Sequence, residues 1–124
     1  MGMRLNPEMM AKCLALAGEA PRPLVDTISE KDFDAAIVEL AKANGWLTYH
    51  TRDSRKSESG FPDRVFVRNG RLIFAELKVP PNVPSAAQQT WIEELSKCNP
   101  KQVIVAVWMP RDWPDIASVL TAAP

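Results

Sequence analysis

The chain has 124 residues, the size of one domain with room for a hydrophobic core. Apolar residues make up 46% of it, charged residues make up 24%, and the formal net charge is zero. With this balance, and with no apolar run near the ~20 residues of a membrane span, composition indicates neither a membrane protein nor a strongly basic partner of nucleic acid. Cys13 and Cys98 are unclustered, as is typical of reduced thiols, and no signal peptide is recognisable, so we expect a cytoplasmic location.

Residues 1–28 form an N-terminal arm, distinct from a predicted domain at 29–124. Within the arm, residues 7–17 can form a short helix with a methionine-rich apolar side, and the glycine and prolines of 18–23 end it. So short a helix does not fold alone. We therefore expect the arm to pack on the domain or on a partner.

The clearest helix signal covers residues 29–44. Ser29 is a good N-cap, Asp32 occupies the third helical position, and Gly45 is a good stop. The apolar residues share one arc at 100° per residue: Phe33, Ala36, Ile37, Leu40 and Ala41. Glu30 falls inside that arc, near Phe33. In the first turn its carboxylate also complements the helix dipole.

Residues 46–51 are predicted to form the first strand, which carries the only histidine, His50. That histidine is either structural, simply exposed, or a contact to DNA or to a metal-bound water. The polar loop 52–60 follows, and its phosphate-contact candidates are Arg52, Arg55 and Lys56. The segment from Arg52 to Arg71 contains six basic residues, Arg64 among them, and three acidic ones. This excess of positive charge predicts either a positive rim that binds phosphate or a solvated loop and turn.

Two β-rich runs, 64–68 and 71–75, flank the dipeptide Asn69-Gly70. An Asn-Gly pair between such runs predicts a hairpin with a two-residue type I′ turn. Counting outward from that turn places Asp63 opposite Glu76, on one sheet face, with Cβ atoms roughly 5 Å apart. Lys78 lies two residues beyond Glu76 and so points to the same face.

Like charges directly opposite one another destabilise a sheet, so this carboxylate pair requires a reason. A divalent cation supplies one, because Mg²⁺ is commonly held by one or two carboxylates together with waters and substrate phosphates. Lys78 can then orient an attacking water or stabilise charge that develops on a phosphate. The alternative is a salt bridge between Lys78 and one acid at a strand end.

After a proline-rich stretch at 79–84, Ser85 is a plausible N-cap for a helix over about 86–98. The apolar side of this helix consists of Trp91, Ile92, Leu95 and Cys98. Gln88 lies on the same stripe and needs a partner there. The partner is either the preceding loop or a group of the site.

Residues 102–108 form a continuous apolar run, typical of a strand buried on both faces, and 115–120 form a short closing helix. Because the last strand follows a helical crossover, we expect it to pair parallel with a neighbour. The predicted fold is an α/β sandwich with a mixed sheet.

Pro62-Asp63, Glu76-Leu77-Lys78 and the spacing of Ser85, Gln88 and Trp91 resemble the PD-(D/E)XK nuclease signature, and specifically its VRR-NUC branch. The resemblance covers about residues 29–120 and implies a restriction-endonuclease-like αβββαβ core. It also implies that Asp63, Glu76 and the Leu77 carbonyl hold Mg²⁺ or Mn²⁺, that Glu30 joins the metal site, and that Gln88 lies beside it. Small members of this branch occur in phages and bacteria, and some act on Holliday junctions.

The sequence therefore predicts a metal-dependent DNA endonuclease acting on branched or duplex DNA, with Asp63, Glu76, Lys78, Glu30 and Gln88 at its site. A junction-cleaving enzyme would be a homodimer, joined through the N-terminal arm or an exposed aromatic tail around Trp108 and Trp113. The alternative is a non-catalytic nucleic-acid-binding module with the same fold, against which the intact Asp63, Glu76 and Lys78 argue. A restriction-type enzyme with base-specific recognition is a third possibility, which the small size weakens.

Overall fold

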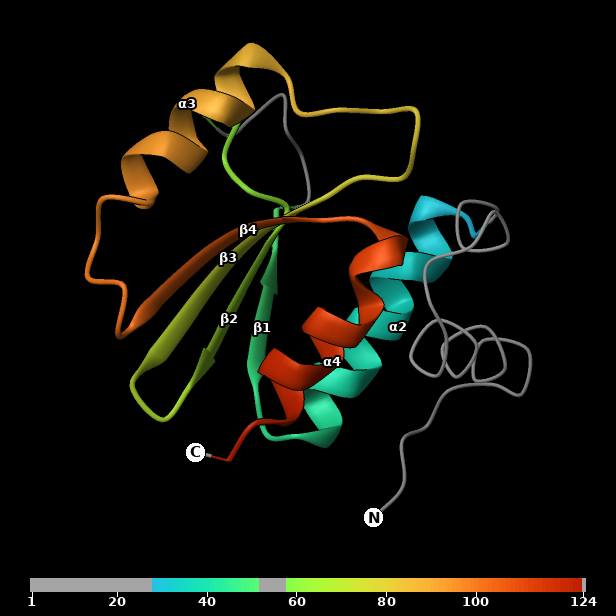
Figure 1. Ribbon diagram of the computed structural model, residues 1–124, viewed down its shortest axis with the longest axis vertical. Coiled ribbons are helices and arrows are strands. Elements are labelled where there is room, and N and C mark those ends of the chain that lie inside the picture. The colour runs from blue at the N-terminus through green and yellow to red at the C-terminus, as the bar shows by residue number, and fades with distance from the viewer. Residues whose placement is uncertain (1–27, 52–57, 124) are drawn as a thin grey trace.

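A four-stranded mixed sheet is the centre of the computed structural model, which describes residues 28–51 and 58–123 (Figure 1). The strands are β1 (Leu47–His50), β2 (Arg64–Arg68), β3 (Arg71–Leu77) and β4 (Val103–Trp108), and they lie in that order across the sheet. The first three pair antiparallel, and β4 pairs parallel with β3, as predicted for a strand that follows a helix. This α/β architecture confirms the predicted restriction-endonuclease-like core.

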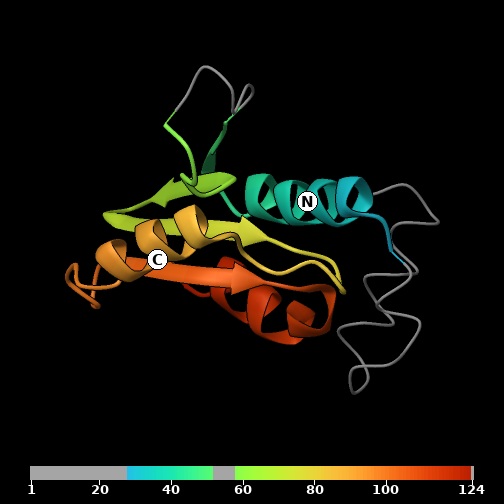
Figure 2. The same cartoon turned by 90° about the horizontal axis from the view of Figure 1, so that it is seen from above.

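Within residues 28–51 and 58–123, three α-helices pack on the sheet: α2 (Glu30–Ala43), α3 (Ala86–Leu95) and α4 (Trp113–Thr121). The last is preceded by a 3-10 turn, η2 (Pro110–Asp112). Figures 1 and 2 show α2 and α4 against one face of the sheet and α3 against the other. No helix among the described residues is long and apolar enough to cross a membrane.

The main core lies between the sheet and the α2–α4 layer. Phe33 and Ile37 of α2 are fully buried there, with Phe66 of β2 and Ile116 of α4. The predicted caps account for the start of α2, because the Ser29 hydroxyl accepts a hydrogen bond from the Asp32 backbone N–H at 3.0 Å. The burial of the predicted apolar arc is confirmed, whereas Glu30, which was predicted to fall inside that arc, is exposed.

A smaller aromatic cluster joins α3 to the other face of the sheet. Phe61 packs edge-to-face on Phe74 of β3 and on Trp91 of α3, with ring centroids 5.9 and 5.1 Å apart. This layer covers only part of its face, and towards the β1 edge Leu47, Tyr49 and Val67 remain exposed. The two faces of the sheet are thus unequally covered.

Several boundaries and environments differ from the sequence-based expectations. The expectation that β4 is buried on both faces is wrong, because β4 is an edge strand whose residues other than Trp108 are half-buried. The predicted helix at 86–98 ends at Leu95, and Cys98 is exposed beyond it. The closing helix begins earlier than 115, at Trp113, because proline is tolerated in a first helical turn.

The expected exposed aromatic tail is also wrong. Trp108 packs near Phe66 in the core, and Trp113 is buried at the start of α4. Neither indole is therefore available to a dimer partner. The N-terminal arm, the other interface considered, lies outside the described residues except for Ile28, which is buried in the main core.

Candidate active site

The hairpin of β2 and β3 brings the predicted carboxylates together. Asn69 and Gly70 both have positive φ, +48° and +79°, as a type I′ turn requires. Pairing runs from Arg68 opposite Arg71 to Arg64 opposite Ala75, so the next facing pair outward is Asp63 and Glu76. The register read from the turn residues is confirmed.

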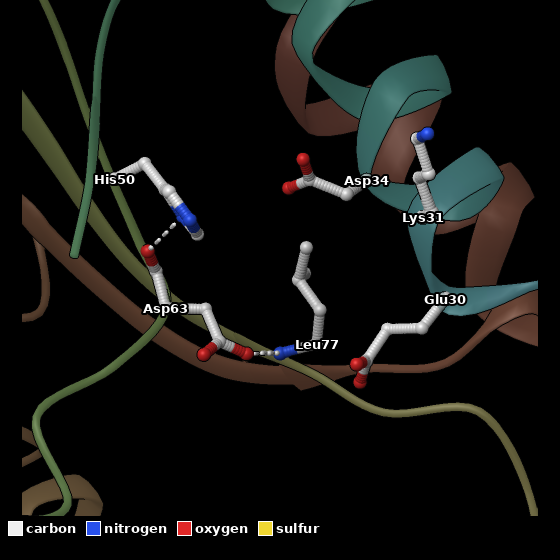
Figure 3. A pocket seen from close by; sticks show the side chains of 6 residues that line it. All are labelled: Glu30, Lys31, Asp34, His50, Asp63 and Leu77. Atoms are coloured by element: carbon white, nitrogen blue, oxygen red, sulfur yellow. Dashed lines mark hydrogen bonds between the residues drawn. The ribbon is translucent and has the colours of Figure 1, made fainter. Parts of the chain in front are cut away.

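Asp63 is anchored to the strands on both sides of it. Its carboxylate accepts a hydrogen bond from the Leu77 backbone N–H of β3 at 3.0 Å. Its backbone carbonyl accepts one from the Thr51 N–H at 3.3 Å, and His50 Nδ1 lies 3.3 Å from the same oxygen. These contacts fix the place of the Asp63 carboxylate, which Figure 3 shows at one side of the adjacent pocket.

Glu76 is the buried charged residue of the core, with 1% of its surface exposed. Neither of its carboxylate oxygens accepts a hydrogen bond from any described residue, although Lys78 Nζ lies 3.3 Å from Oε2. Burial, and then the negative charge of Asp63, raise the pKa of the Glu76 carboxyl to about 7 against the opposing effect of Lys78. A buried, under-coordinated carboxylate beside a second one is a costly arrangement that a bound cation would relieve.

A pocket of about 280 Å³ opens beside Asp63 (Figure 3). Its lining comes from α2, β1 and the ends of β2 and β3: Glu30, Lys31, Asp34, His50, Asp63 and Leu77. Glu30 is exposed to solvent, and its carboxylate reaches from the first turn of α2 toward the side of the pocket formed by Leu77. The structure thus brings Glu30 to the same pocket as Asp63, and His50 lines it too.

Asp34 is a pocket residue that the sequence reasoning missed. It lies one helical turn after Glu30, so the two acids share a side of α2, and that spacing was the available signal. Its carboxylate makes a bidentate ion pair with Arg64, whose Nε and Nη2 donate at 2.8 and 2.7 Å. Arg64, predicted to contact DNA, is therefore engaged by Asp34 at the edge of the pocket.

The other predicted basic contacts divide into two groups. Arg52, Arg55 and Lys56 lie outside the described residues. Arg68, counted in the predicted positive rim, turns inward instead: its guanidinium lies 4.5 Å from the Trp46 ring centroid and donates to the Ala122 carbonyl at 2.6 Å. Arg68 is thus not part of a positive rim around the pocket.

Of the two partners predicted for Gln88, the preceding loop and the site, the structure shows the preceding loop. Its Oε1 accepts from the Ser85 N–H at 2.8 Å, and its own N–H donates to the Ser85 hydroxyl at 3.2 Å. This is a capping box at the start of α3. The structure does not bring Gln88 into the pocket that Asp63 lines.

The donor set fits a hard divalent cation. In the part of the chain that the structure describes, no three His, Cys, Asp or Glu side chains cluster closely enough to hold a metal ion among themselves. Mg²⁺, however, is commonly held by one or two carboxylates with water filling the other positions. Asp63 and Glu76 supply two, and the Glu76 oxygens, which accept no hydrogen bond from the described residues, can serve as ligands of such an ion.

Comparison with known proteins gives one match. The model of the VRR-NUC domain family matches residues 7–108, which include the hairpin and the whole sheet. The match begins within the arm that the resemblance had left out, and it ends with β4, so that α4 lies beyond it. No curated protein and no solved structure gave a match. The match covers most of the chain, and the protein belongs to the VRR-NUC domain family of nucleases.

Proposed function

We propose that this protein is a metal-dependent DNA endonuclease that hydrolyses phosphodiester bonds and selects branched DNA such as a four-way junction or a flap. The observation that carries the proposal is the buried Glu76 carboxylate, which accepts no hydrogen bond from the described residues and is ion-paired with Lys78, directly across the hairpin from Asp63. The VRR-NUC match supports nuclease chemistry and DNA as the substrate. Preference for branched DNA rests on the family resemblance alone.

Asp63 and Glu76 would hold Mg²⁺ or Mn²⁺, with the Leu77 backbone carbonyl as a further ligand. Such an ion, when bound, makes water a stronger nucleophile at neutral pH and offsets charge on the phosphate. The Leu77 N–H holds the Asp63 carboxylate in place for this role, at 3.0 Å. Glu30 would orient a water or a second ion from the opposite side of the pocket.

Lys78 supplies a positively charged side chain next to the two carboxylates. It lies 3.3 Å from Glu76, and its side chain is mostly buried, so its ammonium group is held rather than free to sample solvent. In that position it can orient the attacking water or stabilise the negative charge that accumulates on the phosphoryl oxygens. A homodimer would place two such sites on a four-way junction and make paired nicks.

The test is cleavage of labelled four-way junction, 5′ flap, single-stranded and duplex DNA, with Mg²⁺, Mn²⁺ or EDTA. Glu76→Gln and Asp63→Asn preserve side-chain shape and should abolish cleavage, whereas Glu93→Gln, an exposed acid on α3, should leave it unchanged. Cleavage that persists in the Asp63, Glu76 double variant would overturn the assignment. DNA binding without cleavage of any substrate would favour the non-catalytic binding module.

A second readout does not depend on activity. Titrating Mg²⁺ or Mn²⁺ should raise the melting temperature, because a ligand that binds only the folded state stabilises it. The rise should disappear in Asp63→Asn and persist in Glu93→Gln. An equal rise in all three proteins would mean that the cation binds elsewhere.

A further inference from the structure

A second pocket lies on the side of the sheet that α3 partly covers. It has a volume of about 320 Å³ and is lined by Tyr49, Thr51, Glu58, Phe61 and Trp91. The proposed catalytic role uses none of these side chains. Three of the five are aromatic, and 62% of the Tyr49 surface is exposed.

The aromatic wall of this pocket is held in position. Trp91 Nε1 donates to the Ser59 carbonyl at 3.1 Å, and the Phe61 ring meets the Trp91 ring edge-to-face at 80°. Phe61 in turn packs on Phe74 of β3, with ring planes at 87°. The Trp91 and Phe61 rings are thus pre-ordered, which lowers the entropic cost of binding a flat ligand against them.

The second pocket adjoins the carboxylate site through β1. Tyr49 and Thr51 line it, while His50, between them in sequence, lines the pocket of Asp63. Neighbouring residues of a strand point to opposite faces and have Cα atoms only ~3.8 Å apart. Thr51 also donates its N–H to the Asp63 carbonyl. Because β1 is an edge strand of the sheet, a strand of DNA that passed around its end with a phosphate at Asp63 would bring an adjacent base to the side of the aromatic pocket.

The lining chemistry selects a base rather than a phosphate. The described residues that line the pocket offer a phosphate no positive charge, and one of them, Glu58, is acidic. A carboxylate and a hydroxyl instead match the amino groups and ring nitrogens of a nucleobase. Aromatic side chains bind bases by stacking, and a volume near 300 Å³ lies at the lower end of ligand pockets, as a single-base ligand requires.

We propose that this pocket binds an unpaired nucleobase of the DNA next to the cleaved phosphate, so that the protein favours substrates with single-stranded or unstacked nucleotides. The inference rests on the proposed nuclease function, since it takes the substrate's own base as the ligand. A base within an intact duplex is stacked and paired, and does not reach such a pocket without being unstacked.

The experiment measures DNA binding in EDTA by fluorescence anisotropy, so that hydrolysis plays no part. The probes are a short labelled single strand, the same strand with abasic sites, and its fully paired duplex. Tyr49→Ala should weaken binding of the intact single strand about tenfold, as expected for loss of one stacked base. Binding of the abasic strand and of the duplex should change little, and Tyr49→Phe should restore the affinity.

Leu47→Ala is the matched control. Leu47 lies on the same strand and the same sheet face, is 74% exposed, and does not line the pocket. Its removal should leave single-strand binding unchanged. Equal losses in the Leu47 and Tyr49 variants would instead mean that this sheet face binds the strand without using the pocket, and would overturn the base pocket. Unchanged binding in Tyr49→Ala would overturn it too.

These outcomes are separable from those of the cleavage assay. Suppose that metal-dependent cleavage is lost in Glu76→Gln but that Tyr49→Ala binds single-stranded DNA as tightly as the native protein. The proposed nuclease function would then stand, and the base pocket would be rejected. Suppose instead that binding of the single strand requires both Tyr49 and the bases, but that no DNA is cleaved. The base-pocket proposal would then stand, and the proposed nuclease function would be rejected.

Discussion

The Asp63 carboxylate accepts a hydrogen bond from the backbone N–H of Leu77, the residue that directly follows Glu76. Glu76 itself is buried and accepts no hydrogen bond from the described residues. The two facing carboxylates therefore affect stability with opposite signs. Asp63 gains a charge-assisted contact that joins β2 to β3, whereas burial and the charge of Asp63 disfavour ionised Glu76.

Replacing Asp63 should reveal its structural role at low pH. At pH 5 Glu76 is protonated, because its pKa is about 7, so repulsion between the two acids is absent. Under that condition Asp63→Ala should lower the free energy of unfolding by about 1.5–3 kcal/mol, the value of a lost hydrogen bond to a charged group. Asp63→Asn, which keeps an acceptor oxygen, should cost less. Urea unfolding in EDTA measures both, and equal costs would contradict the contact with Leu77.

Glu76 should make metal-free stability depend on pH. Its carboxyl loses a proton near pH 4.5 when unfolded and near pH 7 when folded. Between these values the folded state binds more protons, so stability falls as pH rises. The loss should reach about 3 kcal/mol above pH 7, at roughly 1.4 kcal/mol per pKa unit. Glu76→Gln should remove this pH dependence of the free energy of unfolding, and at pH 8 the variant should be more stable than the native chain. Urea unfolding midpoints at pH 5 and pH 8 measure both effects. A slope retained in that variant would contradict the raised pKa.

Gly60 should be intolerant of any side chain. Its φ is +90°, and a Cβ there would lie 2.5 Å from the backbone carbon and oxygen of Ala87 in α3. Gly60→Ala should cost about 3 kcal/mol from strain and overpacking, and should reduce cleavage by displacing the loop that carries Asp63. Gly70, at φ +79° with nothing within 4 Å, is the control. Gly70→Ala should cost only about 1 kcal/mol, and similar costs at both positions would argue against the contact with α3.

Gln88 should act through the stability of α3. Gln88→Ala and Ser85→Ala each remove half of the capping box, and each should lower the free energy of unfolding by about 1 kcal/mol. If the cap is the whole role, both variants should retain the same cleavage rate per folded molecule. A rate loss in Gln88→Ala alone would restore the role beside the site that the family resemblance implies.

Features that depend on a few neighbouring residues could be predicted from the sequence. The Asn69-Gly70 turn sets the hairpin register, because type I′ geometry needs two residues that tolerate positive φ. That register alone places Asp63 opposite Glu76. Ser29 and Ser85 mark helix starts for an equally local reason, since their hydroxyls accept hydrogen bonds from N–H groups three residues ahead. The order of elements and the parallel pairing of β4 followed from connection length and hydrophobic pattern.

The environment of each side chain, by contrast, was decided by tertiary structure. Hydrophobic pattern alone does not tell an edge strand from a central one, so β4 was expected to be buried on both faces. The pairing of Arg64 with Asp34, 30 positions earlier, arises only when α2 packs across the sheet. The pocket shared by Glu30, His50 and Asp63 arises from the same packing. The sequence thus determined which chemical groups share one strand end, and three-dimensional packing determined their burial and partners, because those depend on elements distant in the chain.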